Sequence, residues 1–318
     1  MIEPFSRRRF LQTIGPALAG SALSFRLAAA AEHEESRPQR DLKITSVKTF
    51  KLLHTLKRPF GVSVSVPLGR TRSALIVKIE TDAGLVGWGE TGPINGARGT
   101  IDDHLGPMLI GQNPLEYRRL WRKLWGANFG NGLAVGAVEM AINDLRGKTL
   151  GLSVAELFGG RVRDRVPVYG STMNYVEGEE PEDAFPREAA ARVAEGFKAL
   201  KMRIGRYSVA REAKFIRAVR DAVGPDVRLM ADGNAAYVLR SAVQMGRVLD
   251  ELNFDFFEEP LPQSPRYAGY EELRAKLPLP LAGGEAVDSR IAAKHLIDRR
   301  AIDIIQPDAA LCGGIGEA

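Results

Sequence analysis

Three acidic side chains follow three apolar runs at nearly equal intervals in the second half of the chain. Asp232 ends the run LMAD, Glu258 ends FFE, and Glu285 ends AGGE. The spacings of 26 and 27 residues each match one strand-plus-helix unit. The carboxyl ends of barrel strands meet at one mouth, so we expect the three carboxylates to converge. Their mutual repulsion would favour a hard divalent cation such as Mg²⁺, whereas any one acid alone would be read as a helix cap or surface charge.

Two cationic side chains lie one strand-plus-helix unit before Asp232. In the run KMR, strand alternation places Lys201 and Arg203 on the same face. Both could stabilise the anionic oxygens of a carboxylate, and a lysine with a lowered pKa can move a proton. A solvated pair at a strand edge is the competing interpretation. Asp308 follows the last apolar run, 23 residues beyond Glu285, and is suited to orient a catalytic histidine.

The elements that would position these groups alternate between short apolar runs and amphipathic segments. This alternation predicts a parallel sheet with the spacing of a (β/α)8 barrel, and a doubly wound sheet is the alternative. No G-x-G-x-x-G follows the first strand, which argues against a dinucleotide-binding version. Because only six strands precede Ala318, we expect a barrel truncated after the sixth strand. The expected strands are 166–170, 199–204, 227–231, 254–257, 279–282 and 302–306, and the expected helices are 182–195, 208–223, 239–252, 268–276 and 288–298.

The part of the chain before residue 160 has strands first and helices afterwards, an order that predicts an α+β domain. We expect a strand over 43–56, a loop over 58–70 and a hairpin over 73–90. Helices are expected over 100–110, 114–125 and 133–145.

The first 31 residues have the layout of a secretory signal peptide. A charged stretch with Arg7, Arg8 and Arg9 precedes an apolar run over 13–27 and a small-residue exit. The paired arginines before Phe-Leu resemble the twin-arginine export signal. A membrane anchor is the alternative, but Arg26 interrupts a run that is short for a span. We therefore expect a signal peptide over 1–31, a linker over 32–42, and a periplasmic protein without stable membrane insertion.

Charge and cysteine content exclude several classes of protein. The formal net charge is +5, of which residues 1–31 supply +3. The remaining +2, without a basic stripe bearing aromatic residues, argues against nucleic-acid binding. The single cysteine, Cys312, excludes an internal disulfide and a cysteine-rich metal site.

Together these motifs resemble the enolase superfamily, in its mandelate racemase/muconate lactonizing enzyme branch. The segments AINDLRGK (141–148) and LFGG (157–160) resemble the signature of its capping domain. The resemblance implies an α+β capping domain over 43–160 and a (β/α) TIM-type barrel over 161–318. It also implies an Mg²⁺-assisted removal of the proton α to a carboxylate, giving an enediolate. By the same resemblance, the Mg²⁺ or Mn²⁺ ligands are Asp232, Glu258 and Glu285, the K-x-K pair is Lys201 and Arg203, and the sixth-strand acid is Asp308.

One departure from the family pattern shapes the expected reaction. Arg203 stands where the family often has a lysine base, and a guanidinium group stays protonated. We therefore expect proton transfer from a dyad of Asp308 and a histidine, which would lie beyond Ala318. Asn234 and His54, which lies just before the loop expected over 58–70, are the expected substrate contacts, although a lone histidine is more often structural or solvated.

The favoured function is an acid-sugar dehydratase acting on a small carboxylate substrate. A lactone cycloisomerase or racemase of the same superfamily is the alternative within enzymes. A non-catalytic remnant is the alternative outside them, because the dyad histidine is missing and little turnover is expected from six strands. A homo-oligomer is expected for a full-length chain. Substrate choice is expected to depend on the loops over 58–70 and 91–100.

Overall fold

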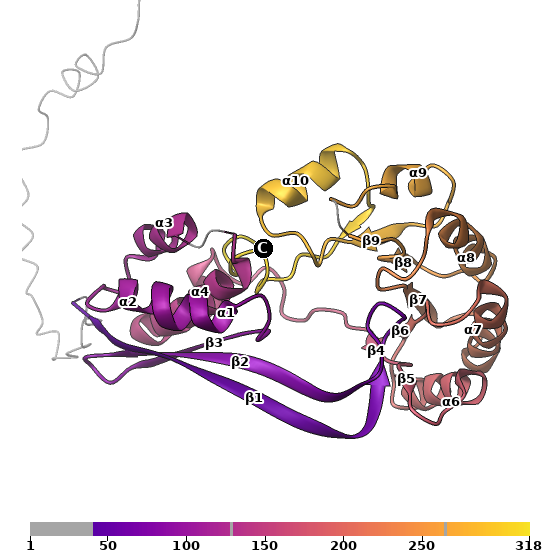
Figure 1. Ribbon diagram of the computed structural model, residues 1–318, viewed down its shortest axis with the longest axis horizontal. Helices are drawn as coiled ribbons and strands as arrows, with labels where there is room; N and C mark the ends of the chain where they lie inside the picture. The colour runs from indigo at the N-terminus through magenta and orange to yellow at the C-terminus, as the bar shows by residue number, and fades with distance from the viewer. Residues whose placement is uncertain (1–40, 128–129, 264–265) are drawn as a thin grey trace, which may run out of the picture. The chain divides into compact units, whose positions relative to one another are not determined.

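The computed structural model describes residues 41–318 except 128–129 and 264–265. The predicted signal peptide and residues 32–40 of the predicted linker lie outside the described residues. The described part belongs to one unit of the chain and contains two sheets (Figure 1). None of its helices combines the length and the apolar character needed to cross a membrane.

The first sheet is antiparallel, and all its strands except β5, which lies beyond residue 160, belong to the predicted α+β domain. Its order is β3-β2-β1-β5. The predicted first strand and hairpin are confirmed, but the loop predicted over 58–70 is too long. The ladder between the first two strands resumes where Phe60 pairs with Gly69, so only residues 62–68 leave the sheet. The strands are β1 (Ile44–Gly61), β2 (Gly69–Thr81), β3 (Val86–Thr91) and β5 (Tyr175–Val176).

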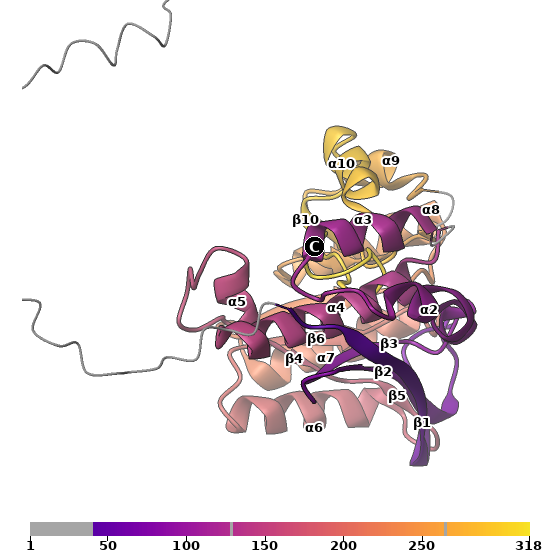
Figure 2. The same ribbon diagram turned by 90° about the vertical axis from the view of Figure 1, so that its left-hand side faces the viewer.

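Helices cover one face of this sheet. Helix α4 lies across β2 and β3 (Figure 2). The helix can pack this closely because Gly87 and Gly89 have no side chain. A Cβ atom added at these positions would lie 2.2 and 1.9 Å, respectively, from carbonyl oxygens of the helix. The single helix predicted over 100–110 is divided, with a π-helical turn at its start. The elements are α1 (Ala97–Gly99), η2 (Thr100–Leu105), α2 (Gly106–Leu109), α3 (Tyr117–Ala127), α4 (Gly132–Leu150) and α5 (Val154–Leu157).

The second sheet is parallel, with the order β10-β9-β8-β7-β6-β4 in the described residues. This order follows the chain without reversal, so it argues against a doubly wound sheet, which reverses at a switch point. The helices lie along the outer side (Figure 1). The strands are β4 (Gly170–Ser171), β6 (Ala199–Arg203), β7 (Arg228–Asp232), β8 (Phe257–Glu258), β9 (Leu281–Gly283) and β10 (Ile304–Ile305). The helices are α6 (Pro181–Ala194), α7 (Val209–Val223), α8 (Leu239–Glu251), α9 (Tyr270–Arg274) and α10 (Arg290–Asp298).

The strand predicted over 166–170 is wrong for most of its length. Val166 and Val168 are 72% and 73% exposed, and only Gly170 belongs to a strand. The remaining predicted strands and helices of this domain are found close to their expected positions. The truncation itself stays a prediction.

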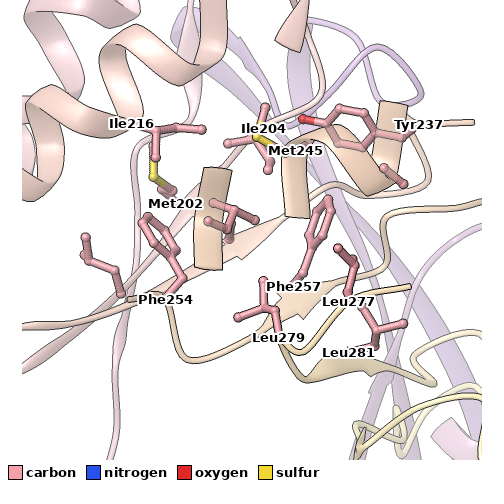
Figure 3. Packing of buried hydrophobic residues seen from close by; sticks show 14 of the residues in the cluster. Met202, Ile204, Ile216, Tyr237, Met245, Phe254, Phe257, Leu277, Leu279 and Leu281 are labelled. Carbon is pink, nitrogen blue, oxygen red and sulfur yellow. The ribbon is translucent and has the colours of Figure 1, made fainter. Parts of the chain in front are cut away.

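The two faces of the parallel sheet have different roles. Met202 and Ile204 pack outward against the helices, together with Phe257 and Leu281 (Figure 3). Alternation along β6 therefore directs Lys201 and Arg203 to the opposite, inner face. A small apolar cluster of Met230, Phe256 and Ala282 lies apart from the outer core. The outer residues thus fix the register that brings polar groups to the inner face.

Helix α4 also contacts the loop that follows β10. A Cβ atom at Gly132 or Gly136 would lie 1.9 and 2.2 Å from the carbonyl oxygens of Leu311 and Ala310. One turn further along α4, the buried carboxylate of Glu139 accepts hydrogen bonds from Tyr117 Oη and Asn143 Nδ2. It also accepts from the backbone nitrogens of residues 315 and 316, at 2.9 and 3.1 Å. This carboxylate fastens the loop to the α+β domain.

Replacing Glu139 by Gln is expected to lower the free energy of unfolding by about 3 kcal/mol, because an amide nitrogen would face backbone donors that the carboxylate now satisfies. Urea unfolding followed by circular dichroism measures the change. Glu116→Gln is the matched control, since Glu116 forms an exposed pair with Arg119 and its loss should cost less than about 1 kcal/mol. Equal midpoints for the two variants would contradict the fastening role of Glu139.

Candidate active site

Neighbouring strands bring three predicted site residues into lateral register. Arg203 pairs with Asp232 across β6 and β7, and Asp232 pairs with Glu258 across β7 and β8. All three stand at the last position of their strands. Asp232 and Glu258 are buried, with only 1% and 5% of their surface exposed. The strand ends therefore hold two carboxylates side by side, away from bulk water.

Lys201 joins these two carboxylates. Its Nζ lies 2.8 Å from both Oε atoms of Glu258 and 3.1 Å from Oδ2 of Asp232. Arg203 also donates to Oδ2 of Asp232. Burial acts to lower the pKa of Lys201, but the attraction of Asp232 and Glu258 outweighs it, so the pKa lies above its usual value. The lysine is therefore a protonated partner of both carboxylates, and its pKa is shifted in the opposite direction to the lowering that proton transfer was expected to use.

Acidic side chains nonetheless dominate this part of the site. Burial raises the pKa of Glu258, and the negative charge of Asp232 adds to the effect. Glu285 lies two residues beyond β9 and is exposed. Partial loss of solvent around its carboxyl group, together with the charges of Glu259, Asp232 and Glu258, raises the pKa of Glu285 to about 7. The predicted third carboxylate thus lies within electrostatic reach of the other two.

Glu259 is a fourth carboxylate that the sequence analysis missed. It has a positive φ of 39° and is 1% exposed. Its carboxylate accepts hydrogen bonds from Tyr267 Oη at 2.7 Å, from Gln263 Nε2 and from the Gly284 backbone nitrogen at 3.3 Å. These bonds join the loops after β8 and β9. The only signal in the sequence was its position beside Glu258, which does not distinguish a loop-holding acid from a ligand.

The carboxylates at the strand ends, all among the described residues, have the chemistry that a hard divalent cation prefers, but not an arrangement that would hold one. The strand ends combine four carboxylates with two cations, Lys201 and Arg203, which leaves an excess of two negative charges when all are ionised. All-oxygen carboxylate sites are those that Mg²⁺ prefers. In the described part of the chain, however, no group of three or more His, Cys, Asp or Glu side chains is arranged to hold a metal ion. Lys201 and Arg203 form ion pairs with Asp232 and Glu258 instead, so the metal site stays a prediction.

The other predicted site residues lie in different surroundings. Asp308 is exposed, and its Oδ1 accepts hydrogen bonds from the backbone nitrogens of Ala310 and Leu311 at 2.7 and 3.2 Å. Asn234 follows Asp232, whose Oδ1 accepts from the Asn234 backbone nitrogen at 2.9 Å. His54 is exposed in β1, opposite Arg72. The roles predicted for these three residues stay predictions.

A short segment of the α+β domain reaches the loops after β6 and β7. We call residues 62–66 the cap loop. Its Val64 nitrogen donates to the Gly205 carbonyl at 3.1 Å, and the hydroxyls of Ser63 and Ser65 donate to the carbonyls of residues 234 and 235 at 3.1 and 3.0 Å. The two serines were not singled out from the sequence, because contacts across about 170 residues leave no local pattern. They do lie within the segment expected to govern substrate choice.

A cavity of about 620 Å³ lies beside α10 and the loop after β8. Its lining includes Tyr267, His295, Leu296 and Arg299 but none of the predicted site residues. Because this cavity contains none of the predicted site residues, we place the candidate active site at the strand ends, where the acidic and basic side chains interact directly.

Two family models match the sequence over the two parts of the fold. Residues 44–159 match the mandelate racemase/muconate lactonizing enzyme N-terminal domain, and residues 184–318 match the enolase C-terminal domain-like family. A D-galactarolactone cycloisomerase from Agrobacterium fabrum is 37% identical over 283 residues, covering 87% of this chain and 74% of that protein. The chain belongs to the enolase superfamily. It has that superfamily's α+β capping domain and its C-terminal barrel-like α/β domain.

Further relatives in the enolase superfamily have related but different activities. An arabinonate dehydratase from Saccharolobus solfataricus is 33% identical over 76% of this chain, which spans 66% of that enzyme. An N-succinyl-L-Arg/Lys racemase from Bacillus cereus is 30% identical, over 86% of this chain and 74% of that enzyme. The relatives are therefore lyases and isomerases.

Solved structures of the enolase superfamily have the same fold. A 3,6-anhydro-D-galactonate cycloisomerase from Zobellia galactanivorans matches with a TM-score of 0.77 and 32% identity, over 86% of this chain and 74% of that one. A dipeptide epimerase from Enterococcus faecalis, complexed with Mg and a dipeptide, matches with a TM-score of 0.77 and 26% identity, over 86% and 77% of the two chains.

Proposed function

We propose that this protein removes the proton α to the carboxylate of an acid sugar, most simply as a dehydratase. The observation that carries the proposal is the buried group at the strand ends, where Lys201 contacts both Asp232 and Glu258. It combines acids suited to hold a cation with a base or acid able to move a proton. Relatives acting on arabinonate and D-galactonate support an acid sugar as the substrate class.

Each strand-end residue has a distinct proposed role. Asp232, Glu258 and Glu285 would hold Mg²⁺ or Mn²⁺, which when bound supplies Lewis-acid stabilisation of the charge that develops on the substrate carboxylate. Arg203 stays protonated and would bind an anionic oxygen of the substrate. Lys201 Nζ would hold or move the proton, because a cation bound by Asp232 and Glu258 would offset the two negative charges that raise its pKa. Asp308 and Asn234 remain proposed contributors from the loops after β10 and β7.

A lactone cycloisomerase is the second candidate. Two cycloisomerases of sugar-derived acids, one matched by sequence and one by structure, favour it. Both candidate reactions begin by breaking the bond between the α-carbon and its hydrogen, so the same residues would serve either reaction. A two-base racemase is less favoured, because Arg203 does not readily accept a proton.

Proton exchange tests the proposal directly. The purified protein is incubated with Mg²⁺ in D₂O and with a panel of aldonates and aldarolactones, and exchange of the α-proton is followed by NMR. Dehydration gives a product lighter by one water, whereas cycloisomerisation leaves the mass unchanged apart from deuterium. We expect exchange with at least one acid sugar. A folded, metal-loaded protein that neither exchanges an α-proton nor forms a dehydrated or isomerised product across the panel would overturn the proposal.

We also propose export to the periplasm by the twin-arginine route, which rests on the N-terminal sequence alone. Replacing Arg7, Arg8 and Arg9 together by Lys is expected to leave the precursor in the cytoplasm, because that route reads the arginine pair. Cell fractionation and immunoblotting measure the distribution. Arg26→Lys, outside the motif, is the control. Normal periplasmic appearance of the triple variant would exclude this route.

A further inference from the structure

Another buried carboxylate lies outside the group at the strand ends, in a position that the proposed function does not use. Glu212 stands in the first turns of α7 and is fully buried. Its Oε1 accepts hydrogen bonds from the backbone nitrogens of Gly205, Arg206 and Tyr207 at 2.8, 2.8 and 3.1 Å. These three residues connect β6 to α7, so the carboxylate gathers the loop that follows Lys201 and Arg203.

Two tyrosine hydroxyls complete the shell around Glu212. Tyr175 Oη donates to Oε1 at 2.9 Å, and Tyr237 Oη donates to Oε2. Burial and the negative charge of Glu212 raise the pKa of both tyrosines, so both stay protonated donors. Tyr237 ends the loop after β7, and Tyr175 lies in β5. One carboxylate therefore ties together three segments that are distant in sequence.

The same three segments carry the cap loop. Gly61, the last residue of β1, pairs with Tyr175, so the strand entering the cap loop is anchored beside Glu212. Gly205, bound to Glu212 through its nitrogen, accepts from the Val64 nitrogen through its carbonyl. The loop ending at Tyr237 supplies the carbonyls that accept from the hydroxyls of Ser63 and Ser65.

The backbone of these supporting loops includes positive φ values and a close approach at Gly205, which the neighbouring structure must hold in place. Gly205 has a φ of 93°, and a Cβ atom there would lie 2.4 Å from the Ala236 side chain. Asn234 and Ala235 have positive φ values of 41° and 60°. Residues other than glycine adopt this region at a cost, and surrounding structure must hold them there. The Asn234 nitrogen donates to Asp232 Oδ1 at 2.9 Å and the Ala235 nitrogen donates to the Glu259 carbonyl at 2.7 Å. The bond from Tyr237 to Glu212 holds the later part of the same loop, and Glu212 itself holds the backbone nitrogen of Gly205.

We propose that Glu212 is a positioning residue that sets the place of the cap loop at the candidate active site by fixing the loops after β6 and β7. This inference rests on the proposed function for its catalytic consequence, but not for its structural one. Glu212 does not touch the strand-end carboxylates and takes no part in the chemistry. It acts through the backbone of Gly205 and through Tyr237.

Amide hydrogen exchange followed by mass spectrometry tests the structural consequence. Glu212→Gln is expected to speed exchange in residues 62–66 and 205–207 by at least about tenfold, the size expected from losing one hydrogen bond to a charged group. Glu139→Gln is the matched control, because it removes another buried carboxylate that binds backbone nitrogens, those of residues 315 and 316. Exchange in 62–66 that is the same in the two variants would overturn the proposal.

A second variant keeps the test decisive if Glu212→Gln does not fold. Tyr237→Phe removes a single hydroxyl and leaves the carboxylate in place, so faster exchange is expected in 62–66 with the same pattern and a smaller size. Unchanged exchange in that loop would count against the proposal.

Kinetics test the catalytic consequence. Glu212→Gln is expected to raise KM for the acid sugar by about tenfold while changing kcat less, because the cap loop is expected to affect ground-state binding. Affinity for Mg²⁺ should stay nearly unchanged, since Asp232 and Glu258 are held by their own strands. An unchanged KM with an altered kcat would contradict the assigned role. If no acid sugar reacts at all, the proposed function fails, and the exchange measurement still decides the role of Glu212.

Discussion

Replacing Glu258 by Gln is expected to weaken Mg²⁺ binding by at least roughly 100-fold, since even partners outside the coordination shell change metal affinity by about 10–100-fold. Glu258 lies between Lys201 and Asp232 in the buried group at the strand ends. Removing its charge leaves Lys201 with one ion-pair partner and the proposed cation with one ligand fewer. Calorimetric titration with Mg²⁺ and Mn²⁺ measures the affinity, and α-proton exchange should be lost in parallel.

The control for this variant must remove a carboxylate without touching the strand ends. Glu251→Gln serves, because Glu251 forms an exposed pair with Arg217 on the outer helices. Circular dichroism confirms that both variants are folded before titration. An affinity for Mg²⁺ that is unchanged in folded Glu258→Gln would remove Glu258 from the ligand set.

Replacing Lys201 by Arg is expected to lower the rate of α-proton exchange by about 10²–10⁴-fold, the usual contribution of general acid–base catalysis. An arginine keeps the positive charge beside Asp232 and Glu258 but does not readily give up a proton. The fold should therefore survive while proton transfer fails. Lys201→Met, which also removes the charge, is expected to lose stability as well, because it leaves buried carboxylates unpaired.

Asp308→Asn is the comparison that separates the two proposed sources of proton transfer. The sequence favoured Asp308, whereas the structure shows its carboxylate exposed and bonded to its own loop. With Lys201 as the proton carrier, the Asp308 variant should retain exchange within about tenfold of the wild-type protein, since the loss of a full acid–base group would cost more. Loss of exchange in Asp308→Asn with retention in Lys201→Arg would reverse the assignment.

The buried group at the strand ends followed from the sequence because two periodic signals coincided. Alternation along β6 put Lys201 and Arg203 on one face, and the spacing of one unit put Asp232 and Glu258 at matching ends of neighbouring strands. Both signals are short-range or strictly repetitive. The structure accordingly shows these four side chains in contact or in register.

The parts that could not be predicted depend on contacts that leave no repeating pattern. Glu212 and Glu259 are acids bonded to backbone nitrogens and tyrosines, and in the sequence they resemble any helical or loop acid. β5 is only two residues long and pairs with a strand more than a hundred residues earlier. The alternating valines at 166 and 168 led to the opposite error, a predicted strand that is absent for most of its length. Alternation does not ensure that a neighbouring strand is present to pair with.

The contact of α4 with the loop after β10 has a consequence for protein engineering. Gly132 and Gly136 lie against backbone carbonyls with no room for a side chain. The carboxylate of Glu139 accepts hydrogen bonds from the backbone of the same loop. A chimera that exchanges only the first 160 residues between relatives would inherit a helix shaped for a foreign loop. The recombination unit that keeps this contact intact consists of the N-terminal domain together with residues 310–316, although the two are far apart in the sequence.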